Sequence, residues 1–348
     1  MSDIYEEISA QRRKVDFDTY DISVQQLLSM LEQDQIDVAP EYQRHFRWKA
    51  PQQAQLIESL FLGIPVPSLF MAANRDGTWE VVDGVQRLST LVHYAGDSAL
   101  RGKIDAGDPL RLEGLEKIPS LNGTSYGELP ESVQLQFSLR PMKVVTLSDK
   151  SDSVVRFDLF ERLNTGGVKL TDQEIRACVF RGRFNDFLRD LASSDSFQDV
   201  VNLSRAKEND GTDEEMVLRF FAFYHRYHRF EHSVVGFLND FMRAASKRFD
   251  YESGRALFLD TFRSLALALP DGIRREARRS TPINLYEAIA VGAALAMDQR
   301  GELAHGNVDW INSDELRALT TGATNTPNMV TGRIEYAARH FGWTPEGE

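Results

Sequence analysis

The sequence predicts an α+β protein in which a small α/β region precedes an all-helical one. Over the first 150 residues, apolar runs of strand length alternate with amphipathic segments of helical length. After that point, every apolar segment repeats with a period of about 3.6 residues, which is the period of an α-helix. The 348 residues suffice for two domains, which we place at residues 1–150 and 151–348.

The composition narrows the classes of function. A net charge of −12 argues against a protein that coats nucleic acid nonspecifically, because such binding relies on cations that displace counterions. A local basic groove remains compatible with this charge. The single cysteine, Cys178, excludes an internal disulfide framework and a cysteine-based metal cluster. Because we find neither a membrane-spanning apolar run nor a signal peptide, we expect a cytoplasmic protein with no membrane partner.

Two helices are predicted before residue 64. Residues 23–33 begin with Ser23 and carry Gln26 three positions later, which is the pattern of a capping box. Residues 51–63 begin with a proline in the first turn and end at Gly63, as many helices do.

The strands of this region are predicted at residues 64–73, 78–82 and 141–147. The turn sequence Asn-Arg-Asp-Gly at residues 74–77 joins the first two, so we expect them to be neighbours in a sheet. The glycine-rich stretch at residues 96–127 is predicted to be irregular.

Beyond residue 150 the amphipathic segments predict helices, and we expect no strand. The segments span residues 151–164, 171–180, 213–228, 233–249 and 283–297.

Residues 79–91, WEVVDGVQRLSTL, pass from an apolar run through Asp83-Gly84 into apolar residues at helical spacing. A strand that ends here and a helix that begins at once would leave the first helical N–H groups unpaired, and such a helix start attracts phosphate. Gly84 would let an anion approach the backbone, and Arg87 would add a forked cation at the rim of a pocket. Asp83 could cap the helix, hold Arg87 or carry a metal through water. The alternative is an ordinary turn followed by a surface arginine.

Four blocks of sequence, taken in order, are more specific than this turn alone. Together they closely resemble the family once catalogued as domain of unknown function 262, the N-terminal domain of GmrSD-type restriction endonucleases. The resemblance extends to residues 213–223 and covers most of residues 20–225. The blocks are PEYQRHFRW at 40–48, GIPVP at 63–67, VVDGVQRLSTL at 81–91 and FERLNTGGVKLTDQEIRACVF at 160–180.

The resemblance implies a ParB/sulfiredoxin-like fold whose Asp-Gly-Gln-Gln-Arg motif binds nucleotide phosphates. It also implies hydrolysis of a nucleoside triphosphate, ATP or GTP with Mg²⁺, in bacterial defence against phage or modified DNA. Carried over by position, the motif assigns catalysis to Asp83, Gln86 and Arg87, and phosphate binding to Gly84 and Arg87. Val85 replaces the first glutamine of the motif. Since a valine side chain cannot form hydrogen bonds, this departure bears on hydrolysis more than on phosphate binding.

The other blocks supply further nucleotide-binding candidates. The resemblance implies that Gln43 and Arg44 face the same pocket, while the aromatic residues around them are expected mostly in the core. Asn164 follows a predicted helix, where its amide could read a base or a ribose, although Asn-Thr-Gly-Gly is also an ordinary helix stop. Glu174 and Arg176 complete the set, and Glu174 also completes a predicted capping box at the start of its helix.

Other patterns are interpreted as structural, and the metal site is left undetermined. His225, His228 and His232 have a spacing that would suit a metal, but an aromatic amphipathic helix explains them more simply. The basic cluster at residues 273–279 is interpreted as a solvated helix face that could touch phosphate. Cys178 is interpreted as a buried residue and not as a nucleophile.

The family's two-component members end in an HNH-type nuclease domain, which needs clustered histidines in an acid-His-Pro context. After residue 230 the histidines of this chain lie far apart in sequence. We therefore expect a nucleotide-binding and nucleoside triphosphate-hydrolysing component of a defence or restriction system, acting with a separate effector protein. The alternative is a non-catalytic module of the same fold that senses DNA or its modification. An autonomous nuclease is not expected.

Overall fold

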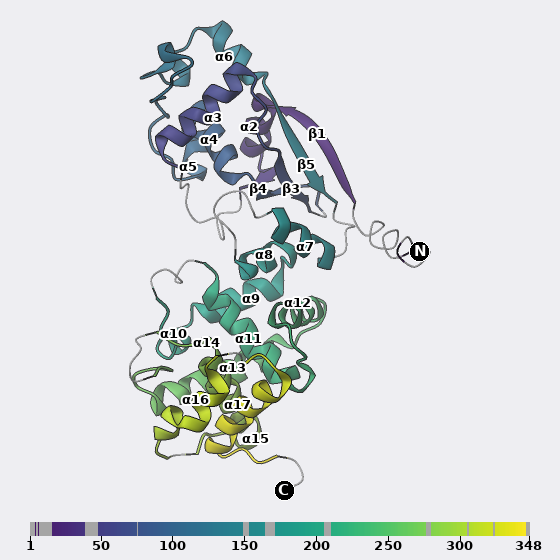
Figure 1. Cartoon of the computed structure of the whole chain (residues 1–348), viewed down its shortest axis with the longest axis vertical. Coiled ribbons are helices and arrows are strands. Elements are labelled where there is room, and N and C mark those ends of the chain that lie inside the picture. Colours follow the sequence, from purple (N-terminus) through teal and green to yellow (C-terminus); the bar gives the residue numbers. More distant parts are fainter. Residues whose placement is uncertain are drawn as a thin grey trace. The chain divides into compact units, whose positions relative to one another are not determined.

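The chain forms two compact units, Met1–Leu170 and Thr171–Glu348, each of which is described by itself (Figure 1). The domain boundary predicted from the sequence, after residue 150, lies 20 residues before the division between these two units. The assignment of residues 1–150 and 151–348 to two domains stays a prediction. The computed structural model describes Ile4, Glu6 and residues 16–38, 48–74, 76–148, 153–163, 171–204, 210–275, 280–304, 306–322 and 324–345.

The first unit is built on a mixed sheet. Its described strands lie in the order β1-β5-β3-β4-β2. Strand β5 pairs antiparallel with β1 and parallel with β3, while β4 pairs antiparallel with β3 and parallel with β2. The strands are β1 (Phe17–Ser23), β2 (Ile36–Asp37), β3 (Leu69–Ala73), β4 (Trp79–Asp83) and β5 (Pro141–Leu147).

The predicted strand pair around residues 74–77 is confirmed, with Ala73 opposite Trp79 and a bulge between Phe70 and Met71. The first strand is shorter than predicted because it starts at Leu69. The residues before it include two prolines, which have no N–H to donate to a ladder. The strands β1 and β2 were not predicted from the sequence.

Helices pack on this sheet through apolar faces. The stop predicted for α3 is confirmed, since Gly63 ends it with a φ of 71°. Of the capping box predicted for α2, the structure shows the half in which the side chain of Ser23 accepts a hydrogen bond from the N–H of Gln26. The helices are α2 (Val24–Glu32), α3 (Ala50–Leu62), α4 (Val85–Ala95), α5 (Ser98–Lys103), α6 (Glu131–Ser138) and α7 (Ser153–Leu163), with 3-10 turns η1 (Pro119–Leu121) and η2 (Tyr126–Glu128).

Helices α3 and α4 lie next to each other over the sheet (Figure 1). Their packing creates one buried apolar cluster, which fixes where α4 starts relative to the end of β4. It includes Leu27 and Leu31 from α2, Ile57 and Leu60 from α3, Leu88 and Leu91 from α4, and Met71, Val81 and Val144 from the sheet.

The second unit contains only helices and irregular segments in its described residues, as the sequence predicts. Its core is rich in aromatic side chains, including Phe220, Phe258 and Phe262. The helices are α8 (Asp172–Val179), α9 (Arg183–Ala192), α10 (Asp195–Gln198), α11 (Thr212–Arg226), α12 (Val234–Ala245), α13 (Tyr251–Ala268), α14 (Ile283–Tyr286), the π-helix η4 (Glu287–Val291), α15 (Gly292–Arg300), α16 (Asp314–Thr320) and α17 (Pro327–His340), with 3-10 turns η3 (Tyr227–Arg229) and η5 (Asp309–Asn312).

Candidate functional site

The turn between β4 and α4 has the predicted strand–turn–helix form. Strand β4 ends at Asp83, Gly84 adopts a φ of 102°, and α4 begins at Val85. Only glycine adopts this φ readily. A Cβ atom at this position would also lie 2.5 Å from Cδ2 of Leu69, so the turn requires glycine for two independent reasons.

The start of α4 is receptive to an anion. Gly84 has no side chain with which to cap the helix, and the first backbone N–H groups of a helix have no partner within it. The helix dipole adds partial positive charge at the same end. The local backbone therefore favours a negatively charged group here.

The side chain of Arg87 lies against this helix start. Its Nη2 donates a hydrogen bond to Oδ2 of Asp83 at 2.7 Å. The guanidinium lies so close to Gly84 that a Cβ there would be 3.1 Å from Nη2. Arg87 is only 7% exposed, so the expectation that it lies at a pocket rim is wrong. Its ion pair with Asp83, one helical turn earlier, draws it inward.

One donor of this guanidinium is not satisfied. The Nη1 atom of Arg87 is buried and has no hydrogen-bond partner among the described residues. A buried donor without a partner costs about 1–3 kcal/mol, and more when it is charged. The helix start and the guanidinium together carry more positive charge than the single carboxylate of Asp83 offsets. An anionic oxygen near Nη1 would supply the missing hydrogen-bond acceptor and would offset the excess positive charge.

Gln86 connects α4 to the chain that enters α3. Its side-chain Oε1 accepts a hydrogen bond from the backbone N–H of Trp48 at 3.0 Å. Nε2 of Gln53 donates to the carbonyl of Trp48 at 2.7 Å, so both backbone polar groups of Trp48 are held. The two candidates Gln43 and Arg44 come just before this anchored residue, outside the described residues.

His93 extends this connection and was not predicted from the sequence. Its Nδ1 lies 2.8 Å from Oε1 of Gln53, and its Nε2 lies 2.9 Å from the carbonyl oxygen of Asp108. Burial lowers the pKa of His93, the hydrogen bond to Asp108 opposes this, and the charge of Arg101 lowers the pKa further. The seven-residue spacing from Gln86 to His93, about two helical turns, was the available sequence signal.

Val85 does not face the anion-receptive side of the turn. It is 6% exposed and belongs to the apolar core of the first unit. In this conformation the side chain at position 85 packs in the core, so Val85 contributes no contact to a ligand at the turn.

The remaining nucleotide-binding candidates are not among the described residues of the first unit. Asn164 lies outside the described residues. Glu174 belongs to the second unit, where its carboxylate accepts from the backbone N–H of Thr171 at 2.6 Å and forms the predicted capping box. Arg176 is fully buried there and pairs with Glu215. Both side chains have structural roles, and their part in nucleotide binding stays a prediction.

Arg176 belongs to a chain of alternating charges that the sequence did not reveal. Glu215 pairs with Arg176 and with Arg219, and Arg219 reaches Glu287 at 2.5 Å. Glu287 also pairs with Arg333, and both of these side chains are fully buried. The chain connects α8, α11, the π-helix η4 and α17.

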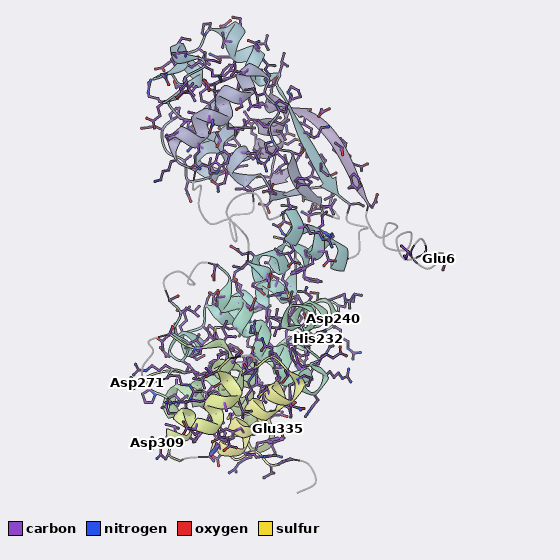
Figure 2. The ribbon with its side chains drawn as sticks, in the orientation of Figure 1. Glu6, His232, Asp240, Asp271, Asp309 and Glu335 are labelled. Atoms are coloured by element: carbon purple, nitrogen blue, oxygen red, sulfur yellow. The ribbon has the colours of Figure 1, made fainter. Side chains whose placement is uncertain are left out.

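The structure also describes parts of the other polar patterns of the second unit. No group of three or more His, Cys, Asp or Glu side chains among the described residues is arranged to hold a metal. His232, the last of the three spaced histidines, is labelled in Figure 2. In the basic cluster, the described residues 273–275 are irregular and not the predicted helix, and Arg275 donates to the carbonyl of Ile311 and to the hydroxyl of Thr320. Cys178 is buried, as predicted, and its thiol donates to the carbonyl of Glu174.

The segment that contains this turn was compared with known protein families. Residues 24–181 match the model of the GmrSD restriction endonuclease N-terminal domain. These residues are similar to that domain, as the four blocks indicate. The similarity favours a component of a restriction or defence system. No curated protein and no solved structure matches the chain. In the described residues, every helix is too short or too polar to cross a membrane.

Proposed function

We propose that the GmrSD-like domain binds a nucleoside triphosphate, ATP or GTP, by its phosphates at the start of α4. The protein would hydrolyse it as part of a bacterial anti-phage or restriction system in the cytoplasm. A separate effector protein would act on the DNA. One observation carries this proposal: the guanidinium of Arg87 is fixed beside a helix start by Asp83, and its buried Nη1 donor has no partner in the described part of the chain.

Each residue of the turn has a defined part in the proposal. The backbone N–H groups after Gly84 and Nη1 of Arg87 would donate to phosphate oxygens. Asp83 holds Arg87 in place and limits the positive charge at the helix start. Gln86 anchors Trp48, and Gln43 and Arg44 of the preceding segment would add contacts to the nucleotide. Mg²⁺ bound with the nucleotide would neutralise phosphate charge, and Asp83 would be the carboxylate available to it. Phosphoryl transfer depends mainly on such positioning and charge stabilisation.

Arg87 is the decisive residue to change. The variant Arg87→Ala is expected to weaken nucleoside triphosphate binding by about one to two decades, or about 1.5–3 kcal/mol, because a charge-assisted contact is lost. The variant Arg87→Lys is expected to restore little, since an ammonium cannot reproduce the planar fork. Calorimetry with ATP and GTP measures affinity, and phosphate release measures turnover.

Two controls make the experiment specific. Arg111→Ala removes an exposed arginine of the same unit, paired with Glu128 at 2.7 Å, and should leave affinity unchanged. Asp83→Asn keeps an acceptor for Arg87 but removes a charge, so binding is expected to hold or strengthen. A selective loss of Mg²⁺-dependent turnover in this variant would assign metal placement to Asp83. Because Arg87 is buried, thermal melting of each variant verifies that the fold is intact.

A second function is favoured by the burial of Val85. The side chain at the position of the first motif glutamine packs in the core, where it cannot orient phosphate or water. A domain of this kind could keep the fold and sense DNA or its modification without catalysis. If the wild-type protein binds no nucleoside triphosphate, with or without Mg²⁺ and DNA, but does bind DNA, this second function replaces the first.

A further inference from the structure

The second unit contains a cavity that the proposed function does not use. It measures about 510 Å³, within the usual range for small-molecule sites. Its lining comes from the end of α11, from α12, from the connection before α13, from the start of α13 and from α15. We call it the α11–α13 cavity.

The walls of the α11–α13 cavity are largely aromatic. Phe221 and Phe249 line it with ring centroids 5.3 Å apart, and His225 stacks with Phe241 at 5.8 Å. Gly254 allows this arrangement, because a Cβ at its position would lie 2.8 Å from the ring of Phe249. Such walls favour a flat ring, which gains dispersion and stacking energy there.

The cavity also carries two arginines that form no ion pair with any described residue. Arg226 lies over the ring of Phe241 at 5.3 Å, and Arg248 is exposed at the lining. Among the residues that the structure describes, neither guanidinium forms an ion pair or a side-chain hydrogen bond. The carboxylates of the lining are already engaged, since Asp298 accepts from the hydroxyl of Tyr224 and Asp250 caps α13.

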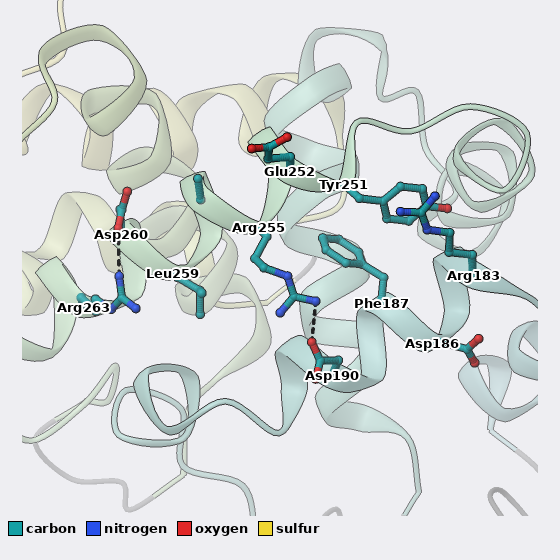
Figure 3. A pocket seen from close by; sticks show the side chains of 11 residues that line it. Arg183, Asp186, Phe187, Asp190, Tyr251, Glu252, Arg255, Leu259, Asp260 and Arg263 are labelled. Carbon is teal, nitrogen blue, oxygen red and sulfur yellow. Dashed lines mark hydrogen bonds and ion pairs between the residues drawn. The ribbon is translucent and has the colours of Figure 1, made fainter.

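A second hollow in the same unit shows the contrast. The groove between α9 and α13 is larger, at about 750 Å³, but two of its three arginines are in ion pairs (Figure 3). These pairs are Arg255–Asp190 at 2.5 Å and Arg263–Asp260 at 3.2 Å, while Arg183 stacks over Tyr251 at 4.1 Å. In the α11–α13 cavity, by contrast, neither lining arginine is in an ion pair with a described residue.

We propose that the α11–α13 cavity binds a mononucleotide. A base would pack against the aromatic walls, and its phosphate would pair with Arg226 and Arg248. Stacking on aromatic rings together with charge-assisted donors from arginine is the chemistry by which proteins hold nucleotides without reading their sequence. This site is independent of the turn at Gly84, so either site can exist without the other.

The experiment is calorimetry of the full-length protein with AMP, GMP, CMP and UMP. Wild type is expected to bind at least one of them, and adenosine or ribose 5-phosphate, which lack the phosphate or the base, should bind at least about tenfold more weakly. Arg248→Ala and Arg226→Ala are each expected to weaken binding by about tenfold to a hundredfold. Ala244→Trp should abolish it by filling the cavity.

Matched controls separate this proposal from the first one. Lys247→Ala removes a neighbouring exposed cation outside the lining and should have no effect. Arg87→Ala should leave mononucleotide binding at this cavity intact, even if it abolishes triphosphate binding at α4. Absence of mononucleotide binding overturns the proposal, as does binding that Arg248→Ala and Ala244→Trp leave unchanged. Binding of a dT oligomer alone, sensitive to the same variants, would also overturn it, because the ligand would then be a nucleic-acid strand.

Discussion

At the residue scale, the main feature of this protein is the buried Arg87. One of its two terminal nitrogen atoms forms a hydrogen bond, and the other forms none with a described residue. Nη2 of Arg87 donates a hydrogen bond to Asp83, while Nη1 has no partner among the described residues. Gly84 makes this possible, since any side chain there would meet Leu69 and the guanidinium. The turn therefore depends on close approach as well as on charge.

The first prediction concerns Gly84. Gly84→Ala is expected to destabilise the first unit by about 2 kcal/mol or more, because alanine is strained at a φ of 102° and its Cβ meets Leu69. Urea unfolding measures the loss. In a double-mutant cycle with Leu69→Ala, part of the cost should disappear, since the clash is removed while the backbone strain stays. Strict additivity of the two changes would show that the contact with Leu69 is unimportant.

The second prediction concerns Val85. Val85→Gln restores the motif of the family but places an amide at a core position that is 6% exposed. We expect a loss of about 1–3 kcal/mol in the free energy of unfolding, because the amide lacks partners there. Val85→Ile is the matched apolar control and should cost less. An unchanged stability together with faster phosphate release would instead mean that the glutamine side chain turns toward the ligand.

At the element scale, α4 and the start of α3 are joined by side chains instead of by the sheet. Gln86 and Gln53 hold the N–H and the carbonyl of Trp48, and His93 holds Gln53. Two of these contacts link residues 38 and 40 positions apart in the chain. The proposed phosphate site on α4 and the start of α3 are thereby coupled.

The third prediction is the pH dependence of this coupling. Because burial lowers the folded-state pKa of His93 below 6.5, the unfolded chain binds more protons there. The contribution of His93 to stability should be fully present above pH 6.5 and decline as the pH falls from 6.5 through the lowered folded-state pKa. Urea midpoints at several pH values measure it. The difference between wild type and His93→Gln, which cannot titrate, should change over this window; a constant difference would contradict the assignment.

At the scale of the whole molecule, the two units are stabilised by different means. The first relies on a mixed sheet covered by apolar helix faces. The second adds a chain of alternating charges that ends in the fully buried pair of Glu287 and Arg333. Buried ion pairs stabilise little relative to apolar residues, but removing one partner is costly because the other charge is left behind.

The fourth prediction tests this chain of charges. Glu287→Gln keeps the size of the side chain but leaves Arg219 and Arg333 without their shared anion, so we expect a loss of about 3–5 kcal/mol in stability. Asp260→Asn breaks an exposed pair with Arg263 and should cost at most about 1 kcal/mol. Denaturant unfolding compares the two variants. Equal losses would show that burial does not determine the energy of these pairs.

The sequence by itself determined the features whose causes lie within a few residues. The cap at Ser23, the stop at Gly63 and the capping box of Glu174 each satisfy backbone groups no more than about one helical turn away. The turn at Gly84 depends on the φ of a single glycine. Periodicity likewise determined the helical second half, because it reflects which side of each segment is apolar.

Only the tertiary structure decided which distant groups meet. The burial of Arg87, the inward direction of Val85 and the pairing of β1 with β5 all depend on how elements pack. So do the contact between Gln86 and Trp48, 38 residues apart, and that between Arg219 and Glu287, 68 residues apart. Judged from the sequence alone, a polar side chain could form its hydrogen bonds with water or with any of many partners. Packing excludes water and leaves one partner within reach, and this choice is made by the fold as a whole.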